Sequence, residues 1–137
     1  MTFEDLKTAF PDATLDTWSQ HSNGGGWVEN TATVAETAYV GPEAVVSENA
    51  VVSENAGVFG NAMVSGYAEV FENAEVFGNA EVFGNAMVSG NAKVFGDAEV
   101  FGNAMVYGDA EVFGNASVSG NASVSGHAVV SGDEIIG

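Results

Sequence analysis

The sequence predicts an all-β fold in which short strands follow one another around a common axis, a β-solenoid. Three observations carry this prediction. A six-residue repeat runs from Thr31 to Gly132, 17 hexads without insertion or deletion. Alanine fills the second position of every hexad and valine the fourth, and glycine fills the sixth in 12 of the 17. Strictly local units repeated without helical segments are typical of stacked strands.

Each hexad predicts one short strand and one corner. Side chains alternate along a strand, so Ala and Val point to one side and the third and fifth residues to the other. Glycine, followed by Asn or Asp, tolerates the positive φ of a tight corner. The Ala and Val columns therefore predict the core, and Val100→Asp is expected to destroy the fold because it places an unpaired charge on the axis.

Hexads such as Val-Phe-Gly-Asn-Ala-Glu and Val-Ser-Gly-Asn-Ala-Met resemble the hexapeptide repeat of left-handed parallel β-helix proteins. That family has an aliphatic residue at one position and a small residue four places later, here for example Val76 and Ala80. The resemblance covers about three quarters of the chain. It implies a left-handed helix of triangular section, with three hexads in each coil of 18 residues and about six coils.

The two ends of the chain depart from the repeat. Residues 1–24 are expected to form an N-terminal cap with a short helix, and residues 25–137 the hexapeptide-repeat β-helix. Gly24, Gly25 and Gly26 are interpreted as a hinge between the two. Residues 133–137 are interpreted as a last strand with an open edge, where Asp133 and Glu134 act as charged gatekeepers.

The helix of the cap is predicted from its first turn. Thr2 is a good N-cap, and Phe3, Leu6 and Phe10 share one face of the helix that follows. Pro11 restricts its end. We expect this segment to cover the apolar mouth of the first coil, as terminal repeats require. The alternative is an arm that docks on a partner.

The outward positions carry an aromatic pattern, because residues 18 apart stack on one side of such a helix. One side has an unbroken ladder in the fifth position, flanked in the third position by Glu75, Lys93 and Glu111, which alternate in sign. The ladder consists of Phe59, Phe77, Phe95 and Phe113. The other two sides have interrupted rows, Ser47, Ser65, Phe83, Phe101 and Ser119 on the second and Ser53, Phe71, Ser89, Tyr107 and Ser125 on the third.

A continuous apolar stripe predicts an interface. We expect a homo-oligomer, most simply a two-fold dimer that brings ladder against ladder, with Lys93 reaching Glu75 or Glu111 of its mate. The expected self-association residues are Phe59, Phe77, Lys93, Phe95 and Phe113. Two or more such faces would instead build a trimer or a fibre. In the simpler alternative, stacked rings only strengthen the contact between coils.

Charge restricts the partners. The chain has 2 Lys and Arg against 19 Asp and Glu, a formal charge of −17, and no Cys. This balance disfavours direct binding to nucleic acid, which needs basic side chains, and to an anionic membrane surface. The N-terminus lacks a signal-peptide pattern and no apolar run reaches membrane-span length, so we expect a cytoplasmic protein.

The acidic side chains allow two interpretations. Charge keeps an exposed β-solenoid from aggregating. Alternatively, a rigid rod covered with carboxylates mimics a nucleic acid and occupies the basic channel of a nucleic-acid-binding protein, as several phage anti-CRISPR and anti-restriction inhibitors do. The expected acidic partner surface consists of Glu69, Glu72, Glu75, Glu81, Asp97, Glu99, Asp109 and Glu111.

An enzyme is not expected. The resemblance points to acyltransferases and to carbonic anhydrases that bind zinc through three histidines, but this chain has only His21 and His127. No loop interrupts the coils, and the negative charge would repel the phosphates of coenzyme A. We therefore predict no catalytic residue, no metal and no cofactor. The second alternative is a degenerate hexapeptide acyltransferase, which would still bind coenzyme A.

Overall fold

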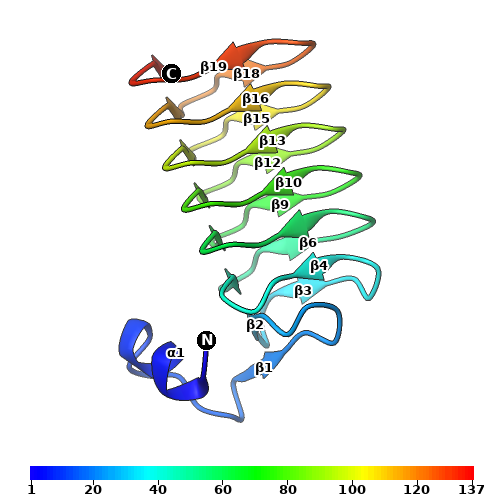
Figure 1. The fold of residues 1–137 in the computed structure, drawn as a ribbon, viewed down its shortest axis with the longest axis vertical. Helices are drawn as coiled ribbons and strands as arrows, with labels where there is room; N and C mark the ends of the chain where they lie inside the picture. The colour runs from blue at the N-terminus through cyan, green and yellow to red at the C-terminus, as the bar shows by residue number, and fades with distance from the viewer.

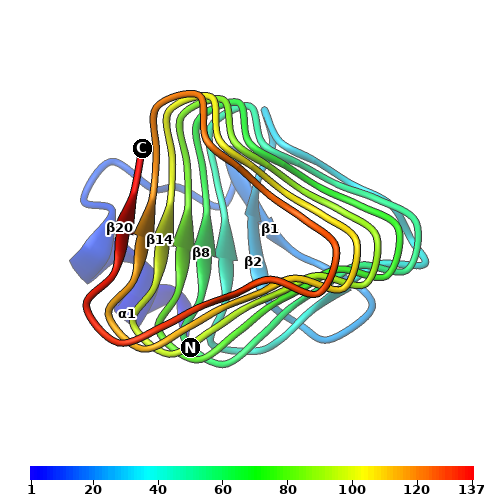
Figure 2. The same cartoon turned by 90° about the horizontal axis from the view of Figure 1, so that it is seen from above.

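The repeat winds into a triangular parallel β-solenoid with one short helix at its N-terminal end, as shown by the computed structural model of residues 1–137 (Figure 1). Seen from the C-terminal end, the chain runs clockwise as it advances toward the viewer, so the coil is left-handed (Figure 2). Paired residues of neighbouring coils are 18 apart, for example Val76 and Val94. The predicted fold and register are confirmed.

Three sheets form the sides of the triangle, and we call them A, B and C. Sheet A has eight strands, and sheets B and C have six each. Sheet A contains β1 (Trp18–Gln20), β2 (Trp27–Glu29), β5 (Val45–Val46), β8 (Met63–Val64), β11 (Glu81–Val82), β14 (Glu99–Val100), β17 (Ser117–Val118) and β20 (Ile135–Ile136). Sheet B contains β3 (Thr33–Val34), β6 (Val51–Val52), β9 (Glu69–Val70), β12 (Met87–Val88), β15 (Met105–Val106) and β18 (Ser123–Val124). Sheet C contains β4 (Tyr39–Val40), β7 (Gly57–Val58), β10 (Glu75–Val76), β13 (Lys93–Val94), β16 (Glu111–Val112) and β19 (Val129–Val130).

The core follows the Ala and Val columns. Every Ala in the second position and every Val in the fourth position is 0% exposed from Ala38 to Val118. These side chains belong to one cluster of 31 buried residues that runs along the axis. Backbone groups of the inner coils pair with the coil before or after them, as with Phe77 N–H donating to the Val94 carbonyl at 2.9 Å. The core is uniform, so what distinguishes the three sides lies outside.

The corners show why glycine dominates the sixth position. Gly78 has φ +70°, and a Cβ there would come within 2.9 Å of the Gly96 backbone nitrogen in the next coil. Glu48, Glu54 and Glu72 occupy the same position with φ of 58° to 60°, at a cost of about 1–2 kcal/mol each. Two of the three side chains offset part of this cost, because Glu48 and Glu72 accept hydrogen bonds from backbone N–H groups of the following coil.

Helix α1 (Phe3–Ala9) begins as predicted. Thr2 is its N-cap and forms a capping box with Asp5. The Thr2 N–H donates to the Asp5 carboxylate at 3.0 Å, and this bond, followed by the Thr2 side chain, holds the pKa of Asp5 below its ordinary value. Leu6 is fully buried on the inner side of the helix.

The helix itself does not cover the mouth of the first coil; of the expected cap of residues 1–24, β1 is the part that lies at this end, paired with β2. The helix lies against the outer face of sheet A (Figure 2), where Leu6 packs in a cluster with Trp18, Trp27 and Val45, and Met63 borders it. The reason lies in the third position of this sheet. The early coils place apolar side chains there, whereas the later ones place Glu81 and Glu99.

The three glycines are a packed turn rather than a hinge. They connect β1 to β2, which pair antiparallel and so cover the first edge of sheet A. Gly24 lies against the Val40 backbone, and Gly26 against the Gly41 carbonyl and the Val40 side chain, so closely that neither has room for a Cβ. The Gly26 N–H donates to the Val40 carbonyl at 2.9 Å. The expected last strand is present as β20 and pairs with β17.

Candidate functional site

The predicted aromatic ladder exists on sheet C. The rings of Phe59, Phe77, Phe95 and Phe113 stack with centroids 4.8–4.9 Å apart and planes within 8° of parallel. Tyr39 meets Phe59 edge-on at 6.3 Å and extends the row by one coil. All four Phe are half-buried, because neighbouring rings cover their faces. The ladder therefore presents a row of ring edges to the outside.

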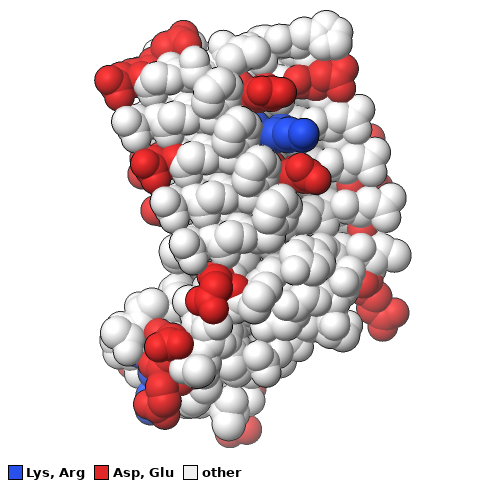
Figure 3. Space-filling model, in the orientation of Figure 1, with Lys and Arg blue, Asp and Glu red and all other residues white.

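A charged column runs beside the ladder. Lys93 is the register partner of Glu75 on one side and of Glu111 on the other. Its side chain is exposed and forms no ion pair, since the contacts between basic and acidic groups in the chain are those of Met1 with Glu43 and of His127 with Asp109. Figure 3 shows a basic group of the solenoid directly between two acidic ones. The three charges form a fixed minus-plus-minus sequence along the axis.

The other two sheets lack an equivalent face. On sheet A, Phe83 and Phe101 stack at 4.9 Å and 2°, with serine in the coils on either side. On sheet B, Ser89 separates Phe71 from Tyr107. Seven of the nine Phe stand in outward positions, and only sheet C joins more than two of them.

The acidic residues proposed as a partner surface do not gather on one face. Two lie on sheet C, two on sheet A and one on sheet B, and three lie at corners. In that order they are Glu75 and Glu111; Glu81 and Glu99; Glu69; and Glu72, Asp97 and Asp109. The structure thus distributes the negative charge around the whole circumference.

The two histidines lie at opposite ends of the solenoid. The Nε2 of His21 is 2.8 Å from the Ala38 carbonyl oxygen, and the Nδ1 of His127 is 3.6 Å from Asp109 in the last coils. No group of three or more His, Cys, Asp or Glu side chains is placed to hold a metal ion. The one helix is also far shorter than a bilayer-spanning segment would have to be.

The structure adds a pocket that the sequence did not predict. It has a volume of about 430 Å³ and lies between the end of α1 and the outer face of sheet A, lined by Phe10, Trp18 and Glu29 among others. The repeat gave no signal for it, because one wall comes from the non-repetitive segment and the other from the coils on which this segment docks.

Comparison of the chain with protein-family models, with curated proteins and with solved structures finds no match. The fold defines its class: a parallel β-helix with a docked N-terminal helix. Its distinguishing outer features are one ring ladder with a charged column and one pocket beside the helix.

Proposed function

We propose that this chain is a non-catalytic interaction protein that self-associates through the outer face of sheet C. The observation that carries the proposal is that the centre of the ring ladder and the centre of the Glu75–Lys93 pair lie at the same height along the solenoid. The midpoint of the four-ring ladder lies between Phe77 and Phe95, and the coils that carry these rings also carry Glu75 and Lys93. One symmetry axis can therefore satisfy both features.

The arrangement that follows is an antiparallel dimer. A two-fold axis between the coils of Phe77 and Phe95, perpendicular to the solenoid, places Phe77 opposite Phe95 of the mate. The same axis places Phe59 opposite the mate's Phe113, so that all four rings meet a ring. It also places each Lys93 opposite a Glu75, and the charged column is complementary to itself.

A parallel dimer fails the same test. With its two-fold axis along the solenoid, it can bring only one of the two columns onto the axis. If the ladder lies there, the charged columns diverge and gain no partner; if the charged column lies there, Lys93 faces Lys93 and Glu75 faces Glu75. Like charges held together cost free energy instead of contributing it. Charge therefore selects the direction of the two solenoids, and the ring edges supply the apolar contact.

Sheet A shows within the same molecule that outward apolar residues of this solenoid are covered when a partner is available. There the partner is α1, which buries Trp27 and Val45 to 5% and 2% exposure. No segment of the chain covers the ladder on sheet C. In the proposed assembly a second copy takes that place.

The experiment is mass measurement by analytical ultracentrifugation of Phe77→Ser/Phe95→Ser. Serine occupies the same column at Ser65 and Ser89, so the fold accepts it there. We expect the wild type at twice the chain mass and the variant at the chain mass. The matched control is Phe83→Ser/Phe101→Ser on sheet A, which removes one stack of the same geometry. An unchanged mass in both variants, or an equal loss in both, contradicts the proposal.

The ion pair gives a second, independent test. Lys93→Glu should lower the mass, because it places Glu opposite Glu75 of the mate. The reversal Glu75→Lys/Lys93→Glu restores complementarity and should restore the dimer. Failure of the double variant to recover the mass would overturn the antiparallel geometry while leaving the ladder as an interface.

Salt separates this function from the nucleic-acid mimic. Two chains of charge −17 repel each other, so salt should strengthen self-association. A decoy bound to a basic partner would weaken with salt. The carboxylates of this chain are spread over all three sheets and form no single face for a basic partner. The geometry therefore favours the dimer over the nucleic-acid mimic.

A further inference from the structure

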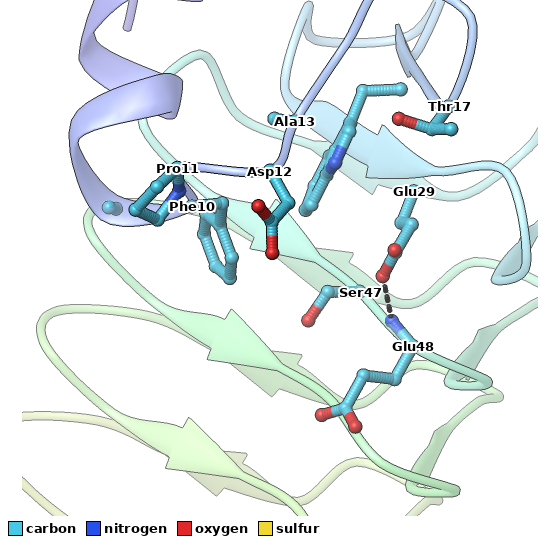
Figure 4. A pocket seen from close by; sticks show the side chains of 10 residues that line it. Phe10, Pro11, Asp12, Ala13, Thr17, Glu29, Ser47 and Glu48 are labelled. Atoms are coloured by element: carbon cyan, nitrogen blue, oxygen red, sulfur yellow. Dashed lines mark hydrogen bonds between the residues drawn. The ribbon is translucent and has the colours of Figure 1, made fainter.

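The pocket beside α1 has an apolar wall and a polar floor (Figure 4). Phe10 and Trp18 form the apolar wall, with ring centroids 5.0 Å apart and planes inclined at 45°. Trp18 is 4% exposed, so its ring is fixed by packing. The open apolar surface of the pocket therefore belongs mainly to the half-buried Phe10, held in place by Trp18 next to the outer face of sheet A.

Three acidic residues line the pocket: Asp12 and Glu29 lie beside this surface, and Glu48 lies at the rim with its carboxylate turned toward the following coil (Figure 4). Glu29 accepts one hydrogen bond through Oε1, from the Glu48 N–H at 2.7 Å, and Glu48 accepts one through Oε1, from the Gly66 N–H at 3.2 Å. The remaining oxygens have no donor in the chain. No cationic group of the protein pairs with any of the three.

A hydroxyl adds an independent sign of a ligand. Ser47 is 3% exposed, and its side chain makes no hydrogen bond within the chain. Figure 4 shows this side chain on the pocket floor, between Asp12 and Glu48, with its hydroxyl pointing into the pocket. No side-chain nitrogen or oxygen of the chain is both fully buried and without a partner, so this hydroxyl is reached from the pocket and is free to bond a polar group there.

We infer that this pocket binds an organic cation on an apolar stem, namely an alkylguanidinium or alkylammonium group such as an arginine or lysine side chain carries. The stem lies along the half-buried ring of Phe10, which Trp18 supports from behind, and this surface suits an aliphatic chain and the face of a guanidinium. The charged head reaches the free carboxylate oxygens, and one of its N–H groups donates to the Ser47 hydroxyl. An anion is excluded by the three acids.

The site lies on sheet A and shares no residue with the ladder of sheet C. It therefore goes beyond self-association and does not depend on it. The Lys93→Glu variant, if monomeric, should bind the same probes with the same affinity.

The experiment is an NMR titration of the full chain with three probes, read on the Trp18 indole N–H. The probes are n-butylguanidinium, N-acetyl-arginine methylamide and its neutral analogue, N-acetyl-citrulline methylamide. We expect the two cations to shift this resonance in a saturable way and the citrulline compound to bind at least about tenfold more weakly. Tighter binding of the blocked arginine than of butylguanidinium would identify a peptide side chain as the ligand, and equal binding a free guanidine or amine.

Matched variants separate a built site from general attraction to an acidic protein. Asp12→Asn and Glu48→Gln should each weaken cation binding about fivefold, and Ser47→Ala should weaken it less. Glu111→Gln removes the same charge on sheet C and should leave the affinity unchanged. The proposal is overturned if the citrulline compound binds as well as the cations, or if Glu111→Gln weakens binding as much as Glu48→Gln.

Discussion

Sheets A and C have the same backbone arrangement and the same inward valines, but their outward apolar side chains are covered in different ways. On sheet A the early coils present Trp27, Val45 and Met63, and the N-terminal segment covers them. On sheet C no other segment of the chain covers the outer face, and the stacked rings cover one another. The difference teaches that the hexad determines only the inside of this solenoid. Its outer positions are free to take a cover from the chain itself or from another molecule.

The largest expected effect applies to the core that both sheets share. Val100→Asp on sheet A and Val94→Asp on sheet C should both abolish the cooperative thermal transition, because each places an unpaired charge at a position with 0% exposure. Circular dichroism during heating measures it. Phe101→Asp, one residue further along and outward-facing, should still unfold cooperatively. A folded Val100→Asp protein would disprove the assigned inward direction.

Removing the cover of sheet A should have the next largest effect. Leu6→Ala removes a fully buried side chain and should weaken the docking of α1 by about 2–5 kcal/mol. We expect increased exposure of Trp18 and Trp27, seen as a red shift of tryptophan fluorescence, with an unchanged melting temperature of the coils. Lys7→Ala, on the same helix but exposed, is the control. A shift in the melting of the whole chain would mean that α1 and the coils unfold as one unit.

A smaller effect compares the stacked rings of the two sheets directly. Phe113→Ser on sheet C and Phe101→Ser on sheet A each remove one stacked neighbour. Each should cost about 1 kcal/mol in the free energy of unfolding, measured at a protein concentration low enough to keep the chain monomeric. At high concentration only the sheet C variant should lose further stability. Equal losses at both concentrations would mean that the ladder serves the coil contacts alone.

The smallest effect concerns the capping box that begins α1. The pKa of Asp5 is lowered by its hydrogen bonds to Thr2, so its contribution to the helix is complete above the ordinary carboxyl pKa. This contribution disappears as the pH falls through the lowered pKa. Backbone carbon shifts of Phe3–Ala9 during an acid titration should show the helix fraying at its first turn. In the Thr2→Ala variant the helical deviation of these shifts should already be smaller at neutral pH and should change less on acidification.

The fold was largely predictable because each hexad states its own local structure. The alternation of side chains along a strand directs Ala and Val inward, and glycine at a positive φ forms the corner. The unbroken six-residue register then suffices to predict that Phe77 stacks on Phe95. The capping box at Thr2 was readable for the same reason, since its partners lie within three residues. The docking site of α1 was not, because it depends on which outward positions far along the chain happen to be apolar.

The solenoid, its core and the neighbours that stack along every face can all be read from the sequence, since they follow from a repeat of fixed period. The three-dimensional packing was needed to place α1 outside sheet A, to pack Gly24 and Gly26 on Val40, and to bring Ser47, Glu29 and Trp18 around one pocket. The physical reason is that the cap has no period. Its position is set by the burial of a few large side chains, and such packing depends on the shape of the surface that the coils present.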